Sequence, residues 1–289
     1  MCSPFDEVLG VLVVQAVDAA TVMMISRRDD GQLEVLMQRR NVNLEFVGGA
    51  YVFPGGKVDD ADRLVVWESL GDGLDDARAS TILAVPSGGL GLYVAALRES
   101  FEEAGVLLAA SGGETPYGRA ALEEYRGQLL RNEVEFVDLI RSMNVRLAFS
   151  RLHYFAHWIT PEGSPRRYDT RFFLAEVPRD AVGIPQEREA TESIWIRPEE
   201  ALARYREKEF ELILPTVKNL EALARFRSYD VAIDSVRRVT EVPTIQPKLV
   251  RDSEGVRIVL PFDPEFDEAE EAFLGSDERL PLTPPPHVE

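Results

Sequence analysis

The sequence contains a single cysteine, Cys2, among its 289 residues, and this scarcity excludes an internal disulfide. A chain without disulfides is typical of a reducing compartment. Long apolar runs are missing as well, since no stretch approaches the roughly eighteen residues that a membrane-spanning helix needs. The nearest candidate, Val8 to Val17, follows acidic residues and has no basic leader, so neither an anchor nor a signal peptide is expected. The last residues, His287 to Glu289, are no Ser-Lys-Leu address, and we therefore predict a cytoplasmic protein.

Positively charged residues are also few compared with acidic ones. Lys and Arg together number 32 against 50 Asp and Glu, which leaves a formal net charge of −18. Proteins that bind nucleic acid usually present a basic stripe, so we expect no nucleic-acid partner. An anionic small molecule is still compatible with this charge, because bound divalent cations can invert the local field. The apolar share of 45% is ordinary for a globular protein, so a core can form without covalent cross-links.

Hydrophobic periodicity and turn residues predict a mixture of strands and helices. The expected strands cover residues 21–25, 34–39, 50–53, 152–159, 171–177 and 193–196. The expected helices cover residues 92–108, 114–143 and 215–227, with a further helix that begins at Pro198. Gly105 is the expected stop of the first helix.

The division of the chain follows from the same pattern. We predict one domain over residues 1–228 and a C-terminal extension over residues 229–289. In the extension, residues 244–250 and 256–260 are expected to pair as a hairpin, followed by an acidic, proline-rich tail.

Three glutamates share one face of the helix expected at residues 92–108. Glu99, Glu102 and Glu103 are three or four residues apart, which places their carboxylates together. Adjacent like charges destabilise a bare helix, and a hard cation such as Mg²⁺ or Mn²⁺ relieves the repulsion because it prefers carboxylate oxygens. Arg98 is placed to orient one carboxylate. Taken alone, such a cluster is more often a solvated acidic surface.

An upstream glycine pair changes this interpretation. In Pro54 to Gly56, paired glycines allow the backbone to approach a metal or phosphate closely, although Pro-Gly-Gly alone is usually a turn. Together the two segments resemble the Nudix box, which has a glycine, a glutamate and then Arg-Glu-aliphatic-any-Glu-Glu-any-Gly-aliphatic. The matching residues are Gly56 in the first half and Arg98, Glu99, Glu102, Glu103, Gly105 and Val106 in the second.

The match departs from the family pattern in three ways. The first glutamate of the box falls on Asp62, and Ser100 stands where an aliphatic residue is usual. The two halves, residues 56–62 and 98–106, are also separated by a far longer spacer than in the family. We expect the surplus, about residues 63–91, to be an insertion with one short helix that loops out, because extra length in a surface loop costs little closure entropy.

The resemblance implies an α+β fold: the Nudix α/β/α sandwich, a mixed sheet between helices, with an insertion inside the box. The interrupted box looks like the acyl-coenzyme A diphosphatase branch, whose animal members are peroxisomal. Val35 to Arg40, Trp158 to Pro161 and Arg167 to Ala175 extend this likeness, which covers roughly residues 18 to 227. The resemblance is also compatible with a homodimer.

The resemblance further implies which residues form the site. Glu99, Glu102 and Glu103, with the Gly56 carbonyl, would bind Mg²⁺ or Mn²⁺. Many Nudix enzymes add an acidic residue from a loop before a late strand. Glu189 is our candidate for it, ahead of Glu187 and Glu192, although a solvated acidic loop is an equal alternative. The general base is open among Glu102, Glu103 and Glu189.

The implied reaction is hydrolysis of a phosphoanhydride in a small nucleotide. Coenzyme A would give adenosine 3′,5′-bisphosphate and 4′-phosphopantetheine. NADH, a nucleotide sugar, or a catalytically silent module that binds a nucleotide are the alternatives. Arginines suit phosphates, although a surface ion pair is the commoner role for any one of them. The candidates are Arg39, Arg40, Arg166, Arg167 and Arg171.

His153 and His157 have the spacing of metal ligands on a helix, but they fall on an expected strand. There the spacing puts them on one face, well separated, so sheet packing is the prediction. Cys2 has no visible base partner, which argues against a catalytic thiol.

Overall fold

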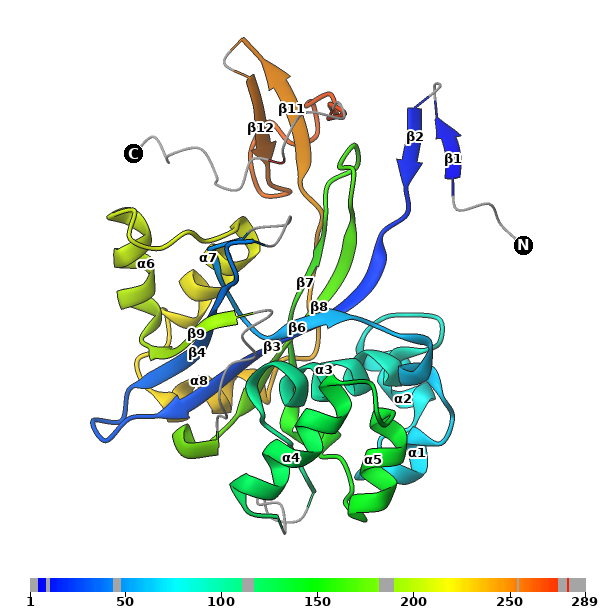
Figure 1. The fold of residues 1–289 in the computed structure, drawn as a ribbon. Coiled ribbons are helices and arrows are strands. Elements are labelled where there is room, and N and C mark those ends of the chain that lie inside the picture. Colours follow the sequence, from blue (N-terminus) through cyan, green and yellow to red (C-terminus); the bar gives the residue numbers. More distant parts are fainter. Residues whose placement is uncertain are drawn as a thin grey trace.

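The computed structural model describes residues 5–8, 11–43, 48–110, 117–181, 190–253, 255–274 and 280. Its centre is an eight-stranded mixed sheet (Figure 1). The strands are β3 (Val17–Arg27), β4 (Leu33–Arg40), β5 (Tyr51–Val52), β6 (Gly55–Lys57), β7 (Leu152–Ile159), β8 (Tyr168–Glu176), β9 (Ala190–Ile196) and β10 (Thr244–Ile245). The order is β10-β7-β8-β3-β4-β5, with β6 paired to β3 and β9 paired to β4.

Strand β3 organises the sheet. It runs parallel to β8 and antiparallel to β4 and β6. Its side chains alternate between two cores: Val22 and Met24 pack into one, and Met23 and Ile25 into the other. A strand covered on both faces is apolar throughout rather than alternately polar, and β3 fits this pattern.

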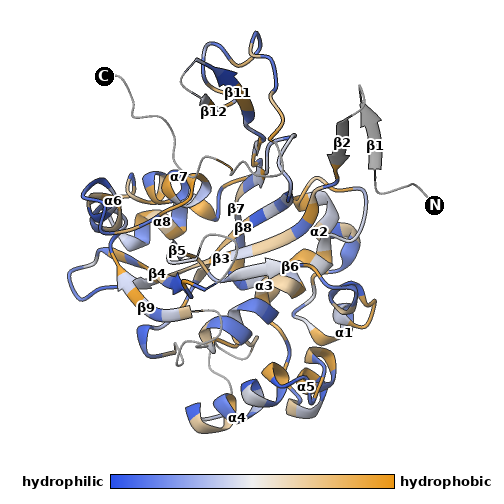
Figure 2. Ribbon diagram, turned by 45° about the horizontal axis from the view of Figure 1, so that its top comes forward, coloured by the Kyte–Doolittle hydropathy of each residue, from blue (hydrophilic) through white to orange (hydrophobic). Residues whose placement is uncertain are grey.

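Helices cover both faces of the sheet (Figure 1). One layer contains α1 (Trp67–Leu70), α2 (Asp76–Ile82), α3 (Gly89–Ala104), α4 (Arg119–Leu130) and α5 (Phe136–Met143). The opposite layer contains α6 (Pro198–Arg206), α7 (Leu214–Leu223) and α8 (Tyr229–Val236). Figure 2 shows that these three helices mix hydrophobic and hydrophilic residues, as helices between a sheet and solvent must. The predicted α/β/α arrangement is confirmed.

The insertion in the box packs more tightly than the sequence suggested. It contains α1, α2 and the first turn of α3, and a 3-10 turn, η1 (Asp60–Arg63), leads into it. Trp67 is only 1% exposed, and its ring centroid lies 5.5 Å from that of Phe136 on α5. Ala79 and Leu83 are buried in the same core. The expectation of a looped-out segment with one short helix is therefore wrong, because these apolar side chains bury themselves under α3.

Two helix boundaries also differ from expectation. Helix α3 begins three residues early and ends at Ala104, since Gly105 takes the left-handed conformation (φ 68°) expected of a stop residue. Residues 106–108 are consequently not helical. The single helix expected over residues 114–143 is two helices, α4 and α5, separated by a turn in which Asn132 has φ 54°.

The chain beyond residue 228 begins as part of the main body. Helix α8, which the sequence did not predict, buries Ala232, Ile233 and Val236 in the same core as α7. Strand β10 pairs parallel to β7. The expected hairpin is present in shorter form, as β11 (Lys248–Asp252) paired with β12 (Gly255–Val259).

The remaining elements lie outside the sheet. Strands β1 (Phe5–Val8) and β2 (Val11–Val14) form a hairpin near the N-terminus, and η2 (Phe149–Arg151) and η3 (Arg179–Ala181) are short 3-10 turns. The expected proline-rich tail falls mostly outside the described residues. Within the described part of the chain, no helix is long and apolar enough to cross a membrane.

Candidate active site

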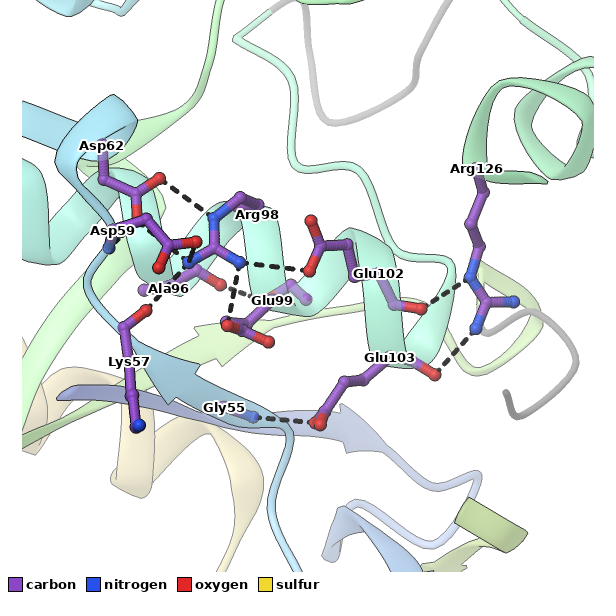
Figure 3. A network of polar contacts seen from close by, with 11 residues as sticks. Gly55, Lys57, Asp59, Asp62, Ala96, Arg98, Glu99, Glu102, Glu103 and Arg126 are labelled. Carbon is purple, nitrogen blue, oxygen red and sulfur yellow. Dashed lines mark hydrogen bonds and ion pairs between the residues drawn. The ribbon is translucent and has the colours of Figure 1, made fainter. Parts of the chain in front are cut away.

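Arg98 is the centre of the polar network on α3 (Figure 3). Its Nε and Nη2 donate to the two carboxylate oxygens of Asp62 at 3.0 and 2.9 Å. Its Nη1 donates to Glu99 Oε1 at 2.9 Å and to Glu102 Oε2 at 3.1 Å. One guanidinium thus joins the two halves of the box, and its bidentate contact with Asp62 is the stronger kind of ion pair.

Burial and charge act in opposite directions on this pair. Asp62 is 1% exposed, and burial raises its pKa, against the lowering effect of Arg98. Burial alone would lower the pKa of Arg98, but the contacts with Asp62, Glu99 and Glu102 raise it above its ordinary value. Arg98 therefore stays charged. The shorter acid at the first glutamate position of the box holds this arginine in place.

The two glycines of β6 bring the backbone against the acidic helix. The Gly55 N–H donates to the Glu103 carboxylate at 2.9 Å. A Cβ atom on Gly56 would overlap the carboxylate of Glu99, and one on Gly55 would lie 2.5 Å from the Ala20 carbonyl oxygen. A larger residue at Gly55 would collide with the backbone of β3, and one at Gly56 would displace the Glu99 carboxylate. The glycine pair lets the backbone approach side chains of the helix closely, while its approach to a metal or phosphate stays a prediction.

Three donors fix the C-terminal end of α3. Arg126, on α4, donates its Nε to the Glu102 carbonyl at 2.8 Å and its Nη2 to the Glu103 carbonyl at 3.0 Å. Gln38, on β4, donates to the same Glu103 carbonyl at 3.1 Å. A buried cation here also suits the negative end of the helix dipole. Nothing in the sequence signals this role, because both residues are remote from the box.

Ser100 does not leave a gap under the helix. It is fully buried, and its hydroxyl donates to the Ala96 carbonyl one turn earlier at 2.7 Å. A serine can replace an aliphatic residue at such a position because a carbonyl of the helix backbone accepts the hydrogen bond of the buried hydroxyl.

A cavity of about 580 Å³ lies beside this network. Glu99 and Glu103 line it, but Glu102, which faces Arg98, does not. The glycines of β6 form part of the same wall. Small-molecule sites commonly have volumes of about 300 to 1,000 Å³, and this cavity lies within that range.

Among the described residues, three cationic side chains line the cavity: Arg40, Lys57 and Arg166. Arg40 and Arg166 were candidates from the sequence. Lys57 was not, although its place directly after the glycine pair could have indicated it. Cations and carboxylates that share a cavity suit a phosphate held together with a metal ion.

The other candidate arginines lie elsewhere. Arg39 is exposed and donates to the Gly49 carbonyl at 3.4 Å. Arg167 and Arg171 are buried and do not line the cavity, so their role in substrate binding stays a prediction. Arg167 donates to the backbone of Thr160 and Val14, and Arg171 lies 2.7 Å from Asp169 in an ion pair. Both serve the packing of the sheet.

The acidic loop before β9 is only partly described. Glu187 and Glu189 lie outside the described residues, so the role of Glu189 stays a prediction. Glu192 is described and accepts a hydrogen bond from the Tyr51 hydroxyl at 2.8 Å. It does not line the cavity.

The two strand histidines take part in sheet packing, as expected. His157 Nε2 lies 2.5 Å from Asp169 Oδ1, and its Nδ1 lies 2.8 Å from the Thr244 hydroxyl. These contacts tie β7 to β8 and β10. His153 is partly buried, and burial together with the nearby Arg237 lowers its pKa.

The site fits a divalent cation by its donor chemistry. Among the described residues no set of three acid, histidine or cysteine side chains is gathered as a ready ligand cage, since Glu99 and Glu102 contact Arg98 and Glu103 contacts Gly55. Glu99 and Glu103 nevertheless line the cavity and offer only oxygen ligands. Such ligands suit Mg²⁺ or Mn²⁺.

Comparison with known proteins identifies the family of this chain. The model of the family described as the NUDT19 Nudix domain matches residues 11–223. The chain is 29% identical over 231 residues to acyl-coenzyme A diphosphatase NUDT19 of Homo sapiens, covering 67% of this chain and 61% of that protein. For the Gallus gallus protein of the same name it is 27% identical over 234 residues, covering 68% and 62%. The chain thus spans about three fifths of the length of these relatives.

A solved structure is also similar. The crystal structure of a NUDIX hydrolase from Alicyclobacillus acidocaldarius superposes with a TM-score of 0.62 at 25% identity. The likeness covers 76% of this chain and 96% of that one.

Proposed function

Because this chain belongs to the NUDT19 Nudix domain family, we propose that it is a metal-dependent hydrolase of coenzyme A or acyl-coenzyme A. The products are adenosine 3′,5′-bisphosphate and (acyl-)4′-phosphopantetheine. The observation that carries this proposal is the cavity of about 580 Å³, which Glu99 and Glu103 line together with Arg40, Lys57 and Arg166. A substrate with a diphosphate and a 3′-phosphate needs several cations, and this cavity provides them.

Different residues of the cavity would bind the metal ion and the phosphates. Mg²⁺ or Mn²⁺, held by Glu99 and Glu103, would neutralise charge on the diphosphate and make water more acidic. Arg98 orients Glu99 from behind, since their hydrogen bond is 2.9 Å long. Arg40, Lys57 and Arg166 bind the phosphate oxygens.

We assign the proton transfer to Glu103, because it lines the cavity and the Gly55 N–H fixes its carboxylate. A water oxygen bonds to one phosphorus, and the bridging P–O bond breaks. The water proton passes to the carboxylate, and the leaving phosphate departs as the second product. Glu102 and Glu189 stay as candidates for this base, Glu189 from outside the described residues.

The test is a substrate panel assayed with Mg²⁺ and with Mn²⁺, with the products identified by mass. We expect release of adenosine 3′,5′-bisphosphate from coenzyme A and its acyl esters. Dephospho-coenzyme A is the matched control, because it lacks only the 3′-phosphate, and a higher KM is expected for it. Fast turnover of NADH or a nucleotide sugar, with none of coenzyme A, would overturn the substrate. Nucleotide binding without metal-dependent turnover of any compound would instead identify a silent module.

A further inference from the structure

A second, smaller cavity of about 170 Å³ adjoins the first. The two cavities share part of their walls and are therefore adjacent. The shared residues are Thr21, Tyr168, Thr170, Phe172 and Ile213.

The chemistry of the two cavities differs. The larger one contains Arg40, Lys57, Arg166, Glu99 and Glu103. Among the described residues that line the smaller one, none carries a charge, and most are aromatic, aliphatic or proline. The hydroxyls of Thr21, Thr160, Thr170 and Tyr168 could replace only part of the hydrogen bonds that a phosphate, a ribose or a second base makes with water. A hydrocarbon chain loses none and gains from burial.

Part of this apolar wall comes from the C-terminal extension. Pro247 and Ile258 line the smaller cavity, and both lie beyond residues 11–223, which match the family model. Ile258 is on β12, 5% exposed, and packs in the same core as α7. The Leu274 N–H donates to the Gly163 carbonyl at 3.0 Å, and the Ala272 N–H to the Leu249 carbonyl at 2.7 Å. These bonds tie the hairpin to the segment after β7.

We infer that the smaller cavity receives the acyl chain of the substrate, so that the C-terminal hairpin selects acylated over free coenzyme A. This inference rests on the proposed function. Its basis is the adjacency of the two cavities, the absence of charge among the described residues that line the second, and its small volume. A cavity of this size fills with a short chain, and longer chains gain nothing further.

The first test follows kcat/KM along a series of free, butanoyl-, hexanoyl-, octanoyl- and decanoyl-coenzyme A. We expect a rise of about four-fold for each methylene that is buried, followed by a plateau. Ile159 lines only the smaller cavity and is half-buried at the end of β7. Ile159→Trp fills this space, so the ratio of acyl to free coenzyme A turnover should fall at least ten-fold. Val231→Trp, on the exposed face of α8, is the matched control and should keep the wild-type ratio.

The second test does not depend on catalysis. Titration calorimetry compares octanoyl-pantetheine with pantetheine, both of which lack the diphosphate. We expect the octanoyl compound to bind at least ten-fold more tightly to the wild-type protein, and equally weakly to Ile159→Trp.

The outcomes separate the two proposals. Turnover that is independent of chain length, and unaltered ratios in Ile159→Trp, would overturn the acyl cavity while the hydrolase stands. Tight binding of octanoyl-pantetheine, abolished by Ile159→Trp, without turnover of any coenzyme A species would support the cavity and overturn the hydrolase.

Discussion

The three glutamates of α3 share one helical face but lie in different environments; they are Glu99, Glu102 and Glu103. Glu102 is turned toward Arg98 and away from the cavity, while Glu99 and Glu103 line it. The difference matters because a carboxylate acts on a substrate only within hydrogen-bond reach of it. The structure thus ranks residues that the sequence treats as equal.

The first prediction concerns this ranking. Glu103→Gln keeps the size of the side chain and an oxygen for the Gly55 N–H, but it removes the charge. We expect kcat to fall by about 100-fold or more, with little change in the melting temperature. Glu102→Gln is the matched control and should lose less, because Glu102 does not line the cavity. Equal losses in the two variants would contradict the assignment of the proton transfer to Glu103.

The second prediction concerns His153 and pH. Burial is the main cause of its lowered pKa, with Arg237 adding to it and Glu176 opposing it. The folded state therefore favours the neutral ring. The stability contributed by His153 is present above the ordinary histidine pKa of 6.5, which the unfolded chain keeps, and is lost as the pH falls through the lowered folded value. Urea unfolding of the wild type and His153→Gln below and above that pH measures this. The wild type should lose more stability on acidification, and parallel losses would contradict the assignment.

At the scale of elements, strand β6 explains the glycine pair. It pairs with β3 and lies under α3, so that three segments meet where a side chain has no room. Gly105, in the left-handed region, then ends α3. Arg126 and Gln38 donate to the carbonyl of Glu103 in the last turn of this helix. Strand, helix end and network together hold the carboxylates still.

The third prediction tests this contact. In Gly56→Ala the added methyl displaces the Glu99 carboxylate. We expect a loss of metal affinity and a fall in kcat of about 100-fold, since misplaced catalytic groups cost this much. Gly118→Ala is the matched control, because nothing lies within 4 Å of its Cβ position and its φ is −68°. A Gly56→Ala variant with normal activity would mean that the close approach is not needed.

The fourth prediction addresses the insertion. Trp67 is 1% exposed, and its indole N–H donates to the Ala61 carbonyl at 2.8 Å. Trp67→Ala should lower the free energy of unfolding by about 3 to 5 kcal/mol, measured by urea denaturation. Trp67→Phe keeps a ring against Phe136 and should lose less. A loss of unfolding free energy below about 1 kcal/mol is typical of surface substitutions, and it would show that the insertion is not packed into the core.

At the scale of the whole molecule, the net charge of −18 and the acidic site act together. Many acidic groups repel one another in the folded state, and the carboxylates of the site add to this locally. A divalent cation at Glu99 and Glu103 would relieve part of the repulsion. The homodimer and the cytoplasmic location stay predictions.

The fifth prediction follows from this charge balance. Saturating Mn²⁺ should raise the melting temperature, because a ligand at about 100 times its Kd adds about 2.7 kcal/mol to the folded state. Removal by EDTA should reverse the shift, and Glu99→Gln should abolish most of it. Sodium chloride of equal ionic strength is the control for general screening. A shift that is equal in sodium chloride, or unaltered in Glu99→Gln, would exclude a cation at this site.

The sequence alone determined the local features of the protein. The acidic face of α3, the stop at Gly105 and the glycine pair depend on spacings within one element, and a helix places residues three and four apart together in any fold. Most strands were also predictable, because alternation and apolar runs are local signals. Helix α8 was missed, since its apolar face is short and recognisable only against α7.

Tertiary structure decided which side chains reach the site. Arg39 and Arg40 are neighbours on β4, yet only Arg40 lines the cavity, because successive residues of a strand point to opposite faces. Arg166 lines the cavity, whereas Arg167 is buried against backbone carbonyls. The sequence shows that arginines are present, but it contains no record of the register that directs each one. That register arises from the pairing of strands distant in the chain. The smaller cavity, to which the C-terminal hairpin contributes, also forms only in the tertiary structure.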